Sequence, residues 1–191
     1  KHPLVLSVLQ ELEGGKISRN FKRLERSLFH SIKKYLIENN LQVCIIHNLF
    51  TRTYNLALTS ALSRLIADLP QIKFIAWVHD VVFYNEPNTK LDHLLGNQYP
   101  WELLVKPIPG LTYVCVSNFL KNNLMAAFNG SNPTEIVVIP NSRDVQKFWG
   151  ISPMMRSLYE NIRGLESDLI ACVPVRAIPR KNLELALQIA R

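Results

Sequence analysis

The chain has 191 residues, 48% of them hydrophobic, which excludes a disordered chain and suits one domain, or one domain and part of another. Its formal net charge of +7 favours anionic partners such as nucleotide diphosphates, acidic lipid headgroups or nucleic acid, without deciding between them. No apolar run approaches the roughly 18 residues of a membrane-spanning helix. Three cysteines lie far apart within apolar runs, the pattern of reduced, buried thiols in a cytosolic protein: Cys44, Cys115 and Cys172.

Three amphipathic helices are predicted in the first two thirds of the chain. The first covers about residues 17–36, where apolar residues recur every three or four positions. The second covers about residues 58–69 and is ended by Pro70. The third begins at Ser117, a good N-cap, and ends at Asn129. The polar faces of the first helix are basic and carry Arg19, Lys22, Arg23, Arg26, Lys33 and Lys34.

Five short runs rich in valine and isoleucine have the pattern of parallel strands that are covered on both faces. They are residues 41–46, 73–78, 112–116, 135–139 and 169–175. Because these strands alternate with helices, the predicted fold class is α/β, with a Rossmann-like parallel sheet flanked by helices.

Polar residues follow the predicted strands at the end where parallel sheets bind their ligands. They are His47, Asn48, His79, Asp80, Ser117, Asn141 and Arg176. We expect His79, next to Asp80, to face a cleft, with a buried core histidine as the alternative. We expect His47 and Asn48 to line the acceptor side of that cleft.

The segment of residues 83–110 shows no periodicity and contains four prolines and a tryptophan. A loop of this length in a compact domain is usually a binding loop or a lid. Within it, Trp101 is a candidate for stacking on a sugar or meeting a membrane surface, whereas Trp77 is expected in the core.

A basic turn follows the fifth predicted strand. Arg176 and Lys181 lie five residues apart across a strand-to-helix turn, so they can converge on one anion. The amino end of a helix predicted from about Asn182 adds backbone N–H groups. A diphosphate leaving group needs such neutralisation. A solvated basic turn is the alternative interpretation.

The fourth predicted strand runs into a Pro-Asn turn. Pro140 and Asn141 end the strand, and Asp144 is placed to fix the loop by hydrogen bonds to the backbone. A purely structural turn is the alternative.

Taken in order, these segments resemble the retaining glycosyltransferases of the GT-B fold, in the "group 1" or family 4 class. The matching motifs are Val78-His79-Asp80, Val116-Ser117, Ile139-Pro140-Asn141-Ser142-Arg143-Asp144 with Phe148, and Val175-Arg176 with Arg180-Lys181-Asn182. Their order and spacing hold from about Gln42 to Arg191. Each motif alone is weak, and the ordered set carries the resemblance.

The resemblance implies an enzyme that moves a sugar from a nucleotide-diphosphate sugar to a glycan, lipid or small-molecule acceptor, without a metal or other cofactor. It implies that His79 bonds a hydroxyl of the transferred sugar and that Asp80 supports the His79 loop. Arg176 and Lys181 would hold the diphosphate of the donor. The cleft would be lined by Ser117, Asn141 and Asp144. We expect a cytoplasmic protein, with a peripheral contact between the basic helix and anionic membrane.

The sequence departs from the family pattern in several places. Ser142 and Val175 stand where the family has glycines, and the family's acidic Glu-x7-Glu pair and its Gly-rich first turn do not occur. We therefore expect an acceptor-side domain over residues 1–150 without its first strand, a connector over 151–167, and the start of a donor-binding domain over 168–191. Such a chain is expected to have little activity alone.

Two other classes remain open at the level of the sequence. A nucleic-acid-binding α/β module would fit the net charge, although no nucleic-acid motif occurs. A nonenzymatic relative that binds sugars or nucleotides is the second. A zinc site built from His47, His79, Asp80 and His93 is disfavoured by the irregular spacing of these residues.

Overall fold

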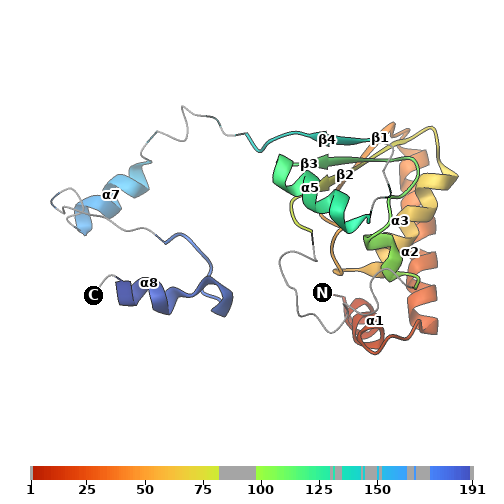
Figure 1. Ribbon diagram of the computed structural model, residues 1–191, viewed down its shortest axis with the longest axis horizontal. Coiled ribbons are helices and arrows are strands. Elements are labelled where there is room, and N and C mark those ends of the chain that lie inside the picture. The colour runs from red at the N-terminus through yellow and green to blue at the C-terminus, as the bar shows by residue number, and fades with distance from the viewer. Residues whose placement is uncertain are drawn as a thin grey trace. The chain divides into compact units, whose positions relative to one another are not determined.

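The computed structural model describes residues 2–81, 98–129, 131, 135–142, 144, 150, 152–162, 166 and 173–189. The chain divides into two compact units, Lys1–Asn141 and Ser142–Arg191. The first unit holds a four-stranded parallel sheet in the order β1-β2-β3-β4, with helices packed against it (Figure 1). This arrangement confirms the predicted α/β, Rossmann-like fold class.

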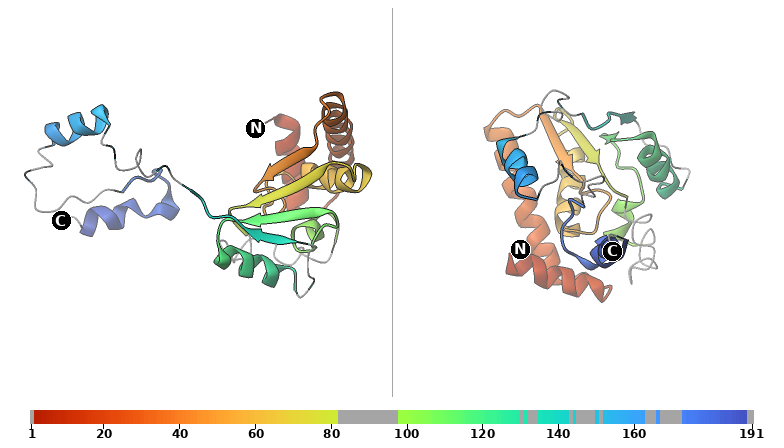
Figure 2. Two further views of the ribbon diagram at one scale, coloured as in Figure 1. Left: turned by 90° about the horizontal axis from the view of Figure 1, so that it is seen from above. Right: turned by 90° about the vertical axis from the view of Figure 1, so that its left-hand side faces the viewer.

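The four strands lie within one or two residues of their predicted positions. They are β1 (Val43–His47), β2 (Lys73–Val78), β3 (Leu111–Cys115) and β4 (Ile136–Val138). The strands run in the same direction, so their carboxyl ends lie at one edge of the sheet (Figure 2). At that edge His47 pairs with Trp77, and Trp77 pairs with Val114.

The helices of the first unit begin at polar caps. The elements are α1 (Pro3–Glu13), α2 (Arg19–Glu38), α3 (Leu56–Asp68), α5 (Asn118–Ala127) and the 3-10 turn η1 (Trp101–Leu104). Ser18 caps α2, Asn55 caps α3 and Ser117 caps α5, each accepting the backbone N–H three residues on. After α5, Asn129 has φ 45°, a left-handed conformation that ends the helix as predicted. The helix α1 was not among the predicted helices.

The main core lies on one face of the sheet. Alternate residues of β2 and β3 point into it, including Phe74, Tyr113 and Cys115, all at most 1% exposed. They share this cluster with α3 and α5, whose Leu65 and Leu124 are 0% exposed. Burial of such side chains stabilises the fold by roughly 1.5–3 kcal/mol each.

The expectation that every strand is covered on both faces is wrong for β1. Val43 and Ile45 are 51% and 50% exposed, because no described residue covers their face of this strand. The apolar sequence of β1 is therefore typical of a strand buried on both faces, although one of its faces is exposed. Hydrophobic runs show what a residue prefers, and only the packing decides whether it is covered.

A second cluster joins α1 to the amino ends of α2 and α3 and to η1. Trp101 lies at its centre and is 0% exposed, packed with Leu12, Phe21 and Leu104. Its ring is buried and has no exposed face that could stack on a sugar or meet a membrane surface, so that prediction was wrong. Most of the segment that was predicted as a loop or lid, residues 83–97, lies outside the described residues.

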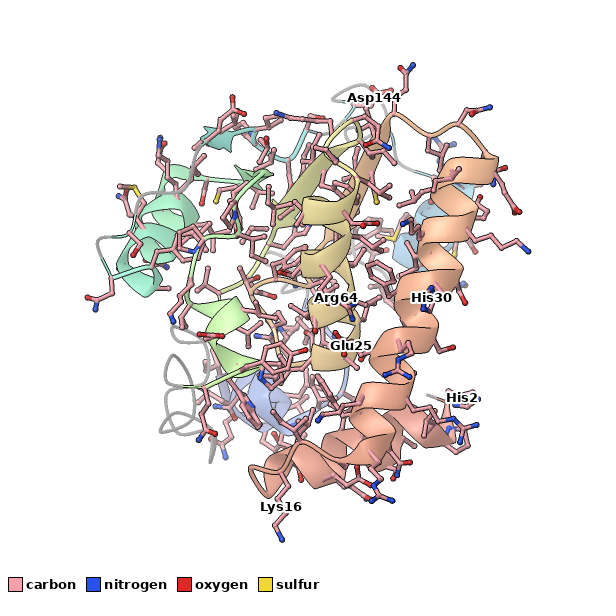
Figure 3. The ribbon with its side chains drawn as sticks, turned by 90° about the vertical axis from the view of Figure 1, so that its right-hand side faces the viewer. His2, Lys16, Glu25, His30, Arg64 and Asp144 are labelled. Carbon is pink, nitrogen blue, oxygen red and sulfur yellow. The ribbon has the colours of Figure 1, made fainter. Side chains whose placement is uncertain are left out.

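A polar group lies between α2 and α3. The Glu25 carboxylate, 9% exposed, accepts hydrogen bonds from Ser60 at 2.9 Å and Arg64 at 3.2 Å, and Figure 3 shows Glu25 and Arg64 pointing toward one another. Tyr99 also donates to Glu25, at 3.3 Å. These bonds satisfy a carboxylate whose burial alone would cost several kcal/mol.

The second unit consists of short elements without a buried core among its described residues. They are α7 (Pro153–Asn161), the 3-10 turn η3 (Pro179–Lys181) and α8 (Leu183–Ile189). The predicted fifth strand is not observed over residues 173–175, and its residues 169–172 lie outside the description. A strand needs a neighbour for its ladder of hydrogen bonds, and the described part of this unit offers none.

Candidate functional site

Asn48 organises the carboxyl ends of β1 and β2. Its side-chain Oδ1 accepts the backbone N–H groups of His79 at 3.1 Å and Asp80 at 3.0 Å. The backbone N–H of Asn48 donates to the Trp77 carbonyl at 2.8 Å. Asn48 has φ 53°, in the left-handed region that asparagine tolerates better than most residues. One side chain thus fixes the path of the chain through the predicted His-Asp pair.

His47 and His79 lie side by side at this edge. Their rings stack with centroids 5.8 Å apart and an interplanar angle of 17°, and His47 Nδ1 is 3.5 Å from His79 Nε2. The His47 ring also stacks on Trp77, at 5.9 Å. Both histidines are exposed, so they face solvent rather than the core, and the core alternative for His79 is excluded.

Asp80 is held by contacts on two sides. Its carbonyl accepts the Thr51 hydroxyl at 2.6 Å, and its Oδ2 lies 3.5 Å from Asn48 Nδ2. Thr51 is 2% exposed and belongs to the β1–α3 loop. The sequence analysis missed Thr51, because nothing near it in the sequence marks it as a partner of a residue 29 positions away.

A pocket of about 270 Å³ brings the β2 end together with the start of α5. It is lined by His79, Asp80, Val81, Ser117, Phe119, Leu120 and Asn123. Ser117 is therefore placed beside the predicted pair, while its Oγ accepts the Leu120 N–H at 3.2 Å as an N-cap. The sequence analysis missed Phe119, which is 71% exposed, and Asn123, which is buried. Their spacing of four residues, one helical turn, was the available signal.

The cysteine nearest this edge is not a nucleophile. Cys115 ends β3 and is 0% exposed, and burial raises the pKa of its thiol to about 11, with Lys121 opposing the shift. The thiol therefore stays protonated near neutral pH, and the thiolate is the reactive form. The reactive groups at this edge are therefore the imidazoles of His47 and His79, the Asp80 carboxylate and the Ser117 hydroxyl.

The other predicted residues lie elsewhere along the chain. Asn141 is exposed, two residues beyond Ile139, which donates to the Cys115 carbonyl at 2.9 Å. Asp144, Arg176 and Lys181 are exposed and belong to the second unit. Lys181 lies in η3, and Arg176 precedes it in a bend in which its carbonyl accepts the N–H of Ile178 at 2.9 Å. The structure thus groups His47, Asn48, His79, Asp80 and Ser117.

The described side chains form no cluster of three or more His, Cys, Asp and Glu that could hold a metal ion. His93, one member of the disfavoured zinc site, lies outside the described residues. Within the described ranges, no helix combines the length and the apolar character that crossing a bilayer requires.

The edge of the sheet presents hydrogen-bonding groups suited to a hydroxylated ligand. Imidazole nitrogens and a serine hydroxyl can donate or accept, a carboxylate accepts, and an exposed phenyl ring adds an apolar surface. The Asn48 bonds fix the His79 backbone before any ligand arrives, as a preorganised site requires.

Comparison with known proteins shows a similarity over most of the chain. The chain is 29% identical over 175 residues to a mannosylglucosylglycerate synthase of Petrotoga mobilis (strain DSM 10674 / SJ95). The match covers 87% of this chain and 38% of the relative, so the chain spans well under half of that protein. No family model and no solved structure matches the chain.

Proposed function

We propose that this chain is the acceptor-side part of a glycosyltransferase that uses a nucleotide-diphosphate sugar. The similarity to a mannosylglucosylglycerate synthase over most of the chain carries the proposal, because it supports a sugar-transferring enzyme in general. The polar edge around His79, on a Rossmann-like sheet, agrees with it. We propose further that the enzyme has the GT-B fold of the family 4 class and retains the configuration at the anomeric carbon.

In this proposal His79 acts on the transferred sugar. Its ring is exposed beside a pocket, and its backbone is fixed by Asn48. A hydrogen bond from this ring to a sugar hydroxyl positions the anomeric carbon and strengthens as positive charge builds there. Asp80 keeps the loop in place through Thr51 and Asn48, so it is a positioning residue.

Arg176 and Lys181 bind the diphosphate of the donor. Both side chains are exposed, and they are five residues apart in the sequence, with Lys181 in η3. Two cations offset the charge that develops on the leaving phosphate, and the reaction then needs no metal ion. Asn141 is the last residue of the first unit and Asp144 belongs to the second, and in this proposal both line the cleft.

The activity belongs to the whole protein, because the relative is much longer than this chain. We place the enzyme in the cytoplasm. The basic face of α2, with Arg19, Lys22, Arg23 and Arg26 around an open surface hollow, is proposed to contact anionic membrane that carries or lies near the acceptor.

Thermal stability of the whole protein tests the donor assignment. UDP, GDP and ADP are added separately, and a nucleotide at 100 times its dissociation constant adds about 2.7 kcal/mol to the free energy of unfolding. We expect one nucleotide to raise the melting temperature, and we expect Arg176→Ala to abolish that rise.

Arg156→Ala is the matched control, because Arg156 is an exposed arginine of the same unit, on α7. It should leave the nucleotide-induced rise unchanged. If no nucleotide stabilises the folded protein, the transferase proposal fails. If Arg176→Ala binds like the wild type, only the diphosphate assignment fails.

A further inference from the structure

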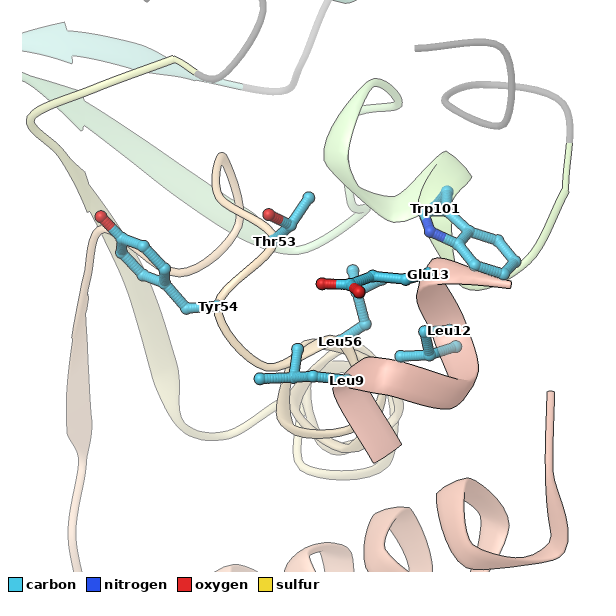
Figure 4. A pocket seen from close by; sticks show the side chains of 7 residues that line it. All are labelled: Leu9, Leu12, Glu13, Thr53, Tyr54, Leu56 and Trp101. Atoms are coloured by element: carbon cyan, nitrogen blue, oxygen red, sulfur yellow. The ribbon is translucent and has the colours of Figure 1, made fainter. Parts of the chain in front are cut away.

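A second pocket lies between α1, the β1–α3 loop and η1. It encloses about 200 Å³ and shares no lining residue with the pocket beside His79. Three leucines give it an apolar lining: Leu9 and Leu12 from α1, and Leu56 from the start of α3 (Figure 4). A mostly apolar hollow with a few polar groups is the usual form of a small-molecule site.

The polar groups come from three different segments. Glu13 ends α1, Thr53 and Tyr54 belong to the β1–α3 loop, and Trp101 begins η1. Figure 4 shows the side chains of Glu13 and Thr53 reaching into the space between Tyr54 and Trp101. The pocket is therefore assembled by the fold and not by one stretch of sequence.

The indole of Trp101 is the feature that calls for a ligand. The side chain is 0% exposed, and its Nε1 has no hydrogen-bond partner among the residues that the structure describes. Buried tryptophan N–H groups usually have a partner, because an unsatisfied buried donor costs free energy. The N–H is covered in the free pocket, so a ligand oxygen would supply that partner after a small shift of the side chains around it.

The combination of groups selects the chemistry of the ligand. The indole N–H only donates, the Glu13 carboxylate only accepts, and the Thr53 hydroxyl does both. A ligand that serves all three must carry both donors and acceptors, and a compound with several hydroxyl groups provides them. The carboxylate disfavours a phosphate or another anion, while the leucines and the Tyr54 ring can cover the C–H surface of a sugar ring.

The pocket is connected to the edge of the sheet through one loop. Thr51 bonds the Asp80 carbonyl at 2.6 Å, and Thr53 lines the pocket two residues later. A shift of Thr51 or of Thr53 therefore moves the same short β1–α3 loop.

We propose that this pocket binds an uncharged sugar unit of the acceptor, an inference that rests on the proposed transferase function. Glu13 accepts hydrogen bonds from sugar hydroxyls, Trp101 Nε1 donates to a sugar oxygen, and the Leu9 side of the pocket packs on the ring.

Calorimetric titration of the whole protein with D-glucose, with D-mannose and with glucose 6-phosphate tests this assignment. We expect one of the neutral sugars to bind and the phosphorylated sugar to bind more weakly. Loss of a hydrogen bond to a charged group weakens binding by about tenfold or more, so we expect that loss of affinity in Glu13→Ala. Thr53→Ala should show a smaller loss.

Glu102→Ala is the matched control. Glu102 adjoins Trp101 in η1, pairs with Lys106 at 2.7 Å and does not line the pocket, so sugar affinity should stay at the wild-type value. Nucleotide binding, measured on the same samples, should be equal in all variants, and urea denaturation shows whether the first unit is folded in each of them.

Neutral sugars that bind equally well to wild type, Glu13→Ala and Thr53→Ala would overturn the assignment. Absence of sugar binding in a protein that binds a nucleotide would overturn the assignment and leave the proposed function intact. Sugar binding that depends on Glu13 in a protein that binds no nucleotide would support the pocket and overturn the transferase proposal.

Discussion

Asn48 and Asp80 lie 32 residues apart in the chain, and Asn48 Oδ1 accepts the Asp80 backbone N–H at 3.0 Å. The same oxygen accepts the N–H of His79. The side-chain amide of Asn48 thus joins the ends of two neighbouring strands. Because it fixes the His79 backbone, it also positions the exposed His79 ring.

Asn48→Ala should destabilise the first unit by about 2–4 kcal/mol. The substitution removes two hydrogen bonds, and it places alanine at φ 53°, where a side chain with Cβ is strained by about 1–2 kcal/mol. Urea denaturation followed by circular dichroism measures the change. Asn48→Gly loses the same bonds without the strain, so it should be less destabilised than Asn48→Ala; equal values would contradict the left-handed backbone at this position.

His79→Ala should reduce sugar transfer by the whole protein about 100-fold or more, the usual effect of removing one preorganised transition-state hydrogen bond. Binding of the bare nucleotide should stay unchanged, since the proposed partner of His79 is the sugar. Transfer rates and nucleotide affinity are the measurements. His30→Ala, an exposed histidine on α2, is the control and should transfer at the wild-type rate. Transfer by His79→Ala at that rate would remove His79 from the site.

Alkaline pH should destabilise the first unit through two buried groups. Burial raises the pKa of Tyr113 to about 12 and that of Cys115 to about 11, above their ordinary values of 10.0 and 9.0. The unfolded chain therefore releases these protons first, so their contribution is complete below pH 9 and falls as the pH rises toward 12. For Tyr113 the loss amounts to about 2–3 kcal/mol at most.

Tyr113→Phe separates the phenol from other alkaline effects. At pH 7 it should be less stable than the wild type, because Ile108 loses the acceptor of its N–H at 3.0 Å. Between pH 9 and 11 its stability, measured by urea denaturation, should fall less steeply. Parallel pH profiles for the two proteins would refute the buried-phenol explanation.

The basic face of α2 should bind anionic vesicles in a salt-dependent way. Arg19, Lys22, Arg23 and Arg26 lie together on one side of the helix, and each basic residue near an anionic surface contributes about 1 kcal/mol. Cosedimentation with phosphatidylserine vesicles should be lost when these four residues are replaced by glutamine. Replacing Lys33 and Lys34, which pair with Asp68 and Glu38, should have a smaller effect. No cosedimentation at low salt would end the proposal of membrane contact.

The sequence by itself determined the fold class and the edge at which polar residues gather. Runs of valine and isoleucine, helical periodicity and Ser117 as an N-cap are local signals, and the structure confirms the strands, the cap and the α/β class. Polar residues directly after buried strands meet at one edge because parallel strands end together. His47, Asn48, His79 and Asp80 could therefore be grouped before the structure was known.

Only the tertiary structure decided which groups touch and which are buried. The bond between Thr51 and Asp80 depends on the register of β1 and β2, and Val43 stays exposed because no described element packs on its face of the sheet. From the sequence Trp101 is predicted to lie in a loop, yet it is buried, and its N–H has no partner among the described residues. It lines a pocket with Glu13, a residue 88 positions earlier in the chain. Local propensity follows from neighbours in the sequence, whereas burial and hydrogen-bond partners are set by packing between segments that the sequence keeps far apart.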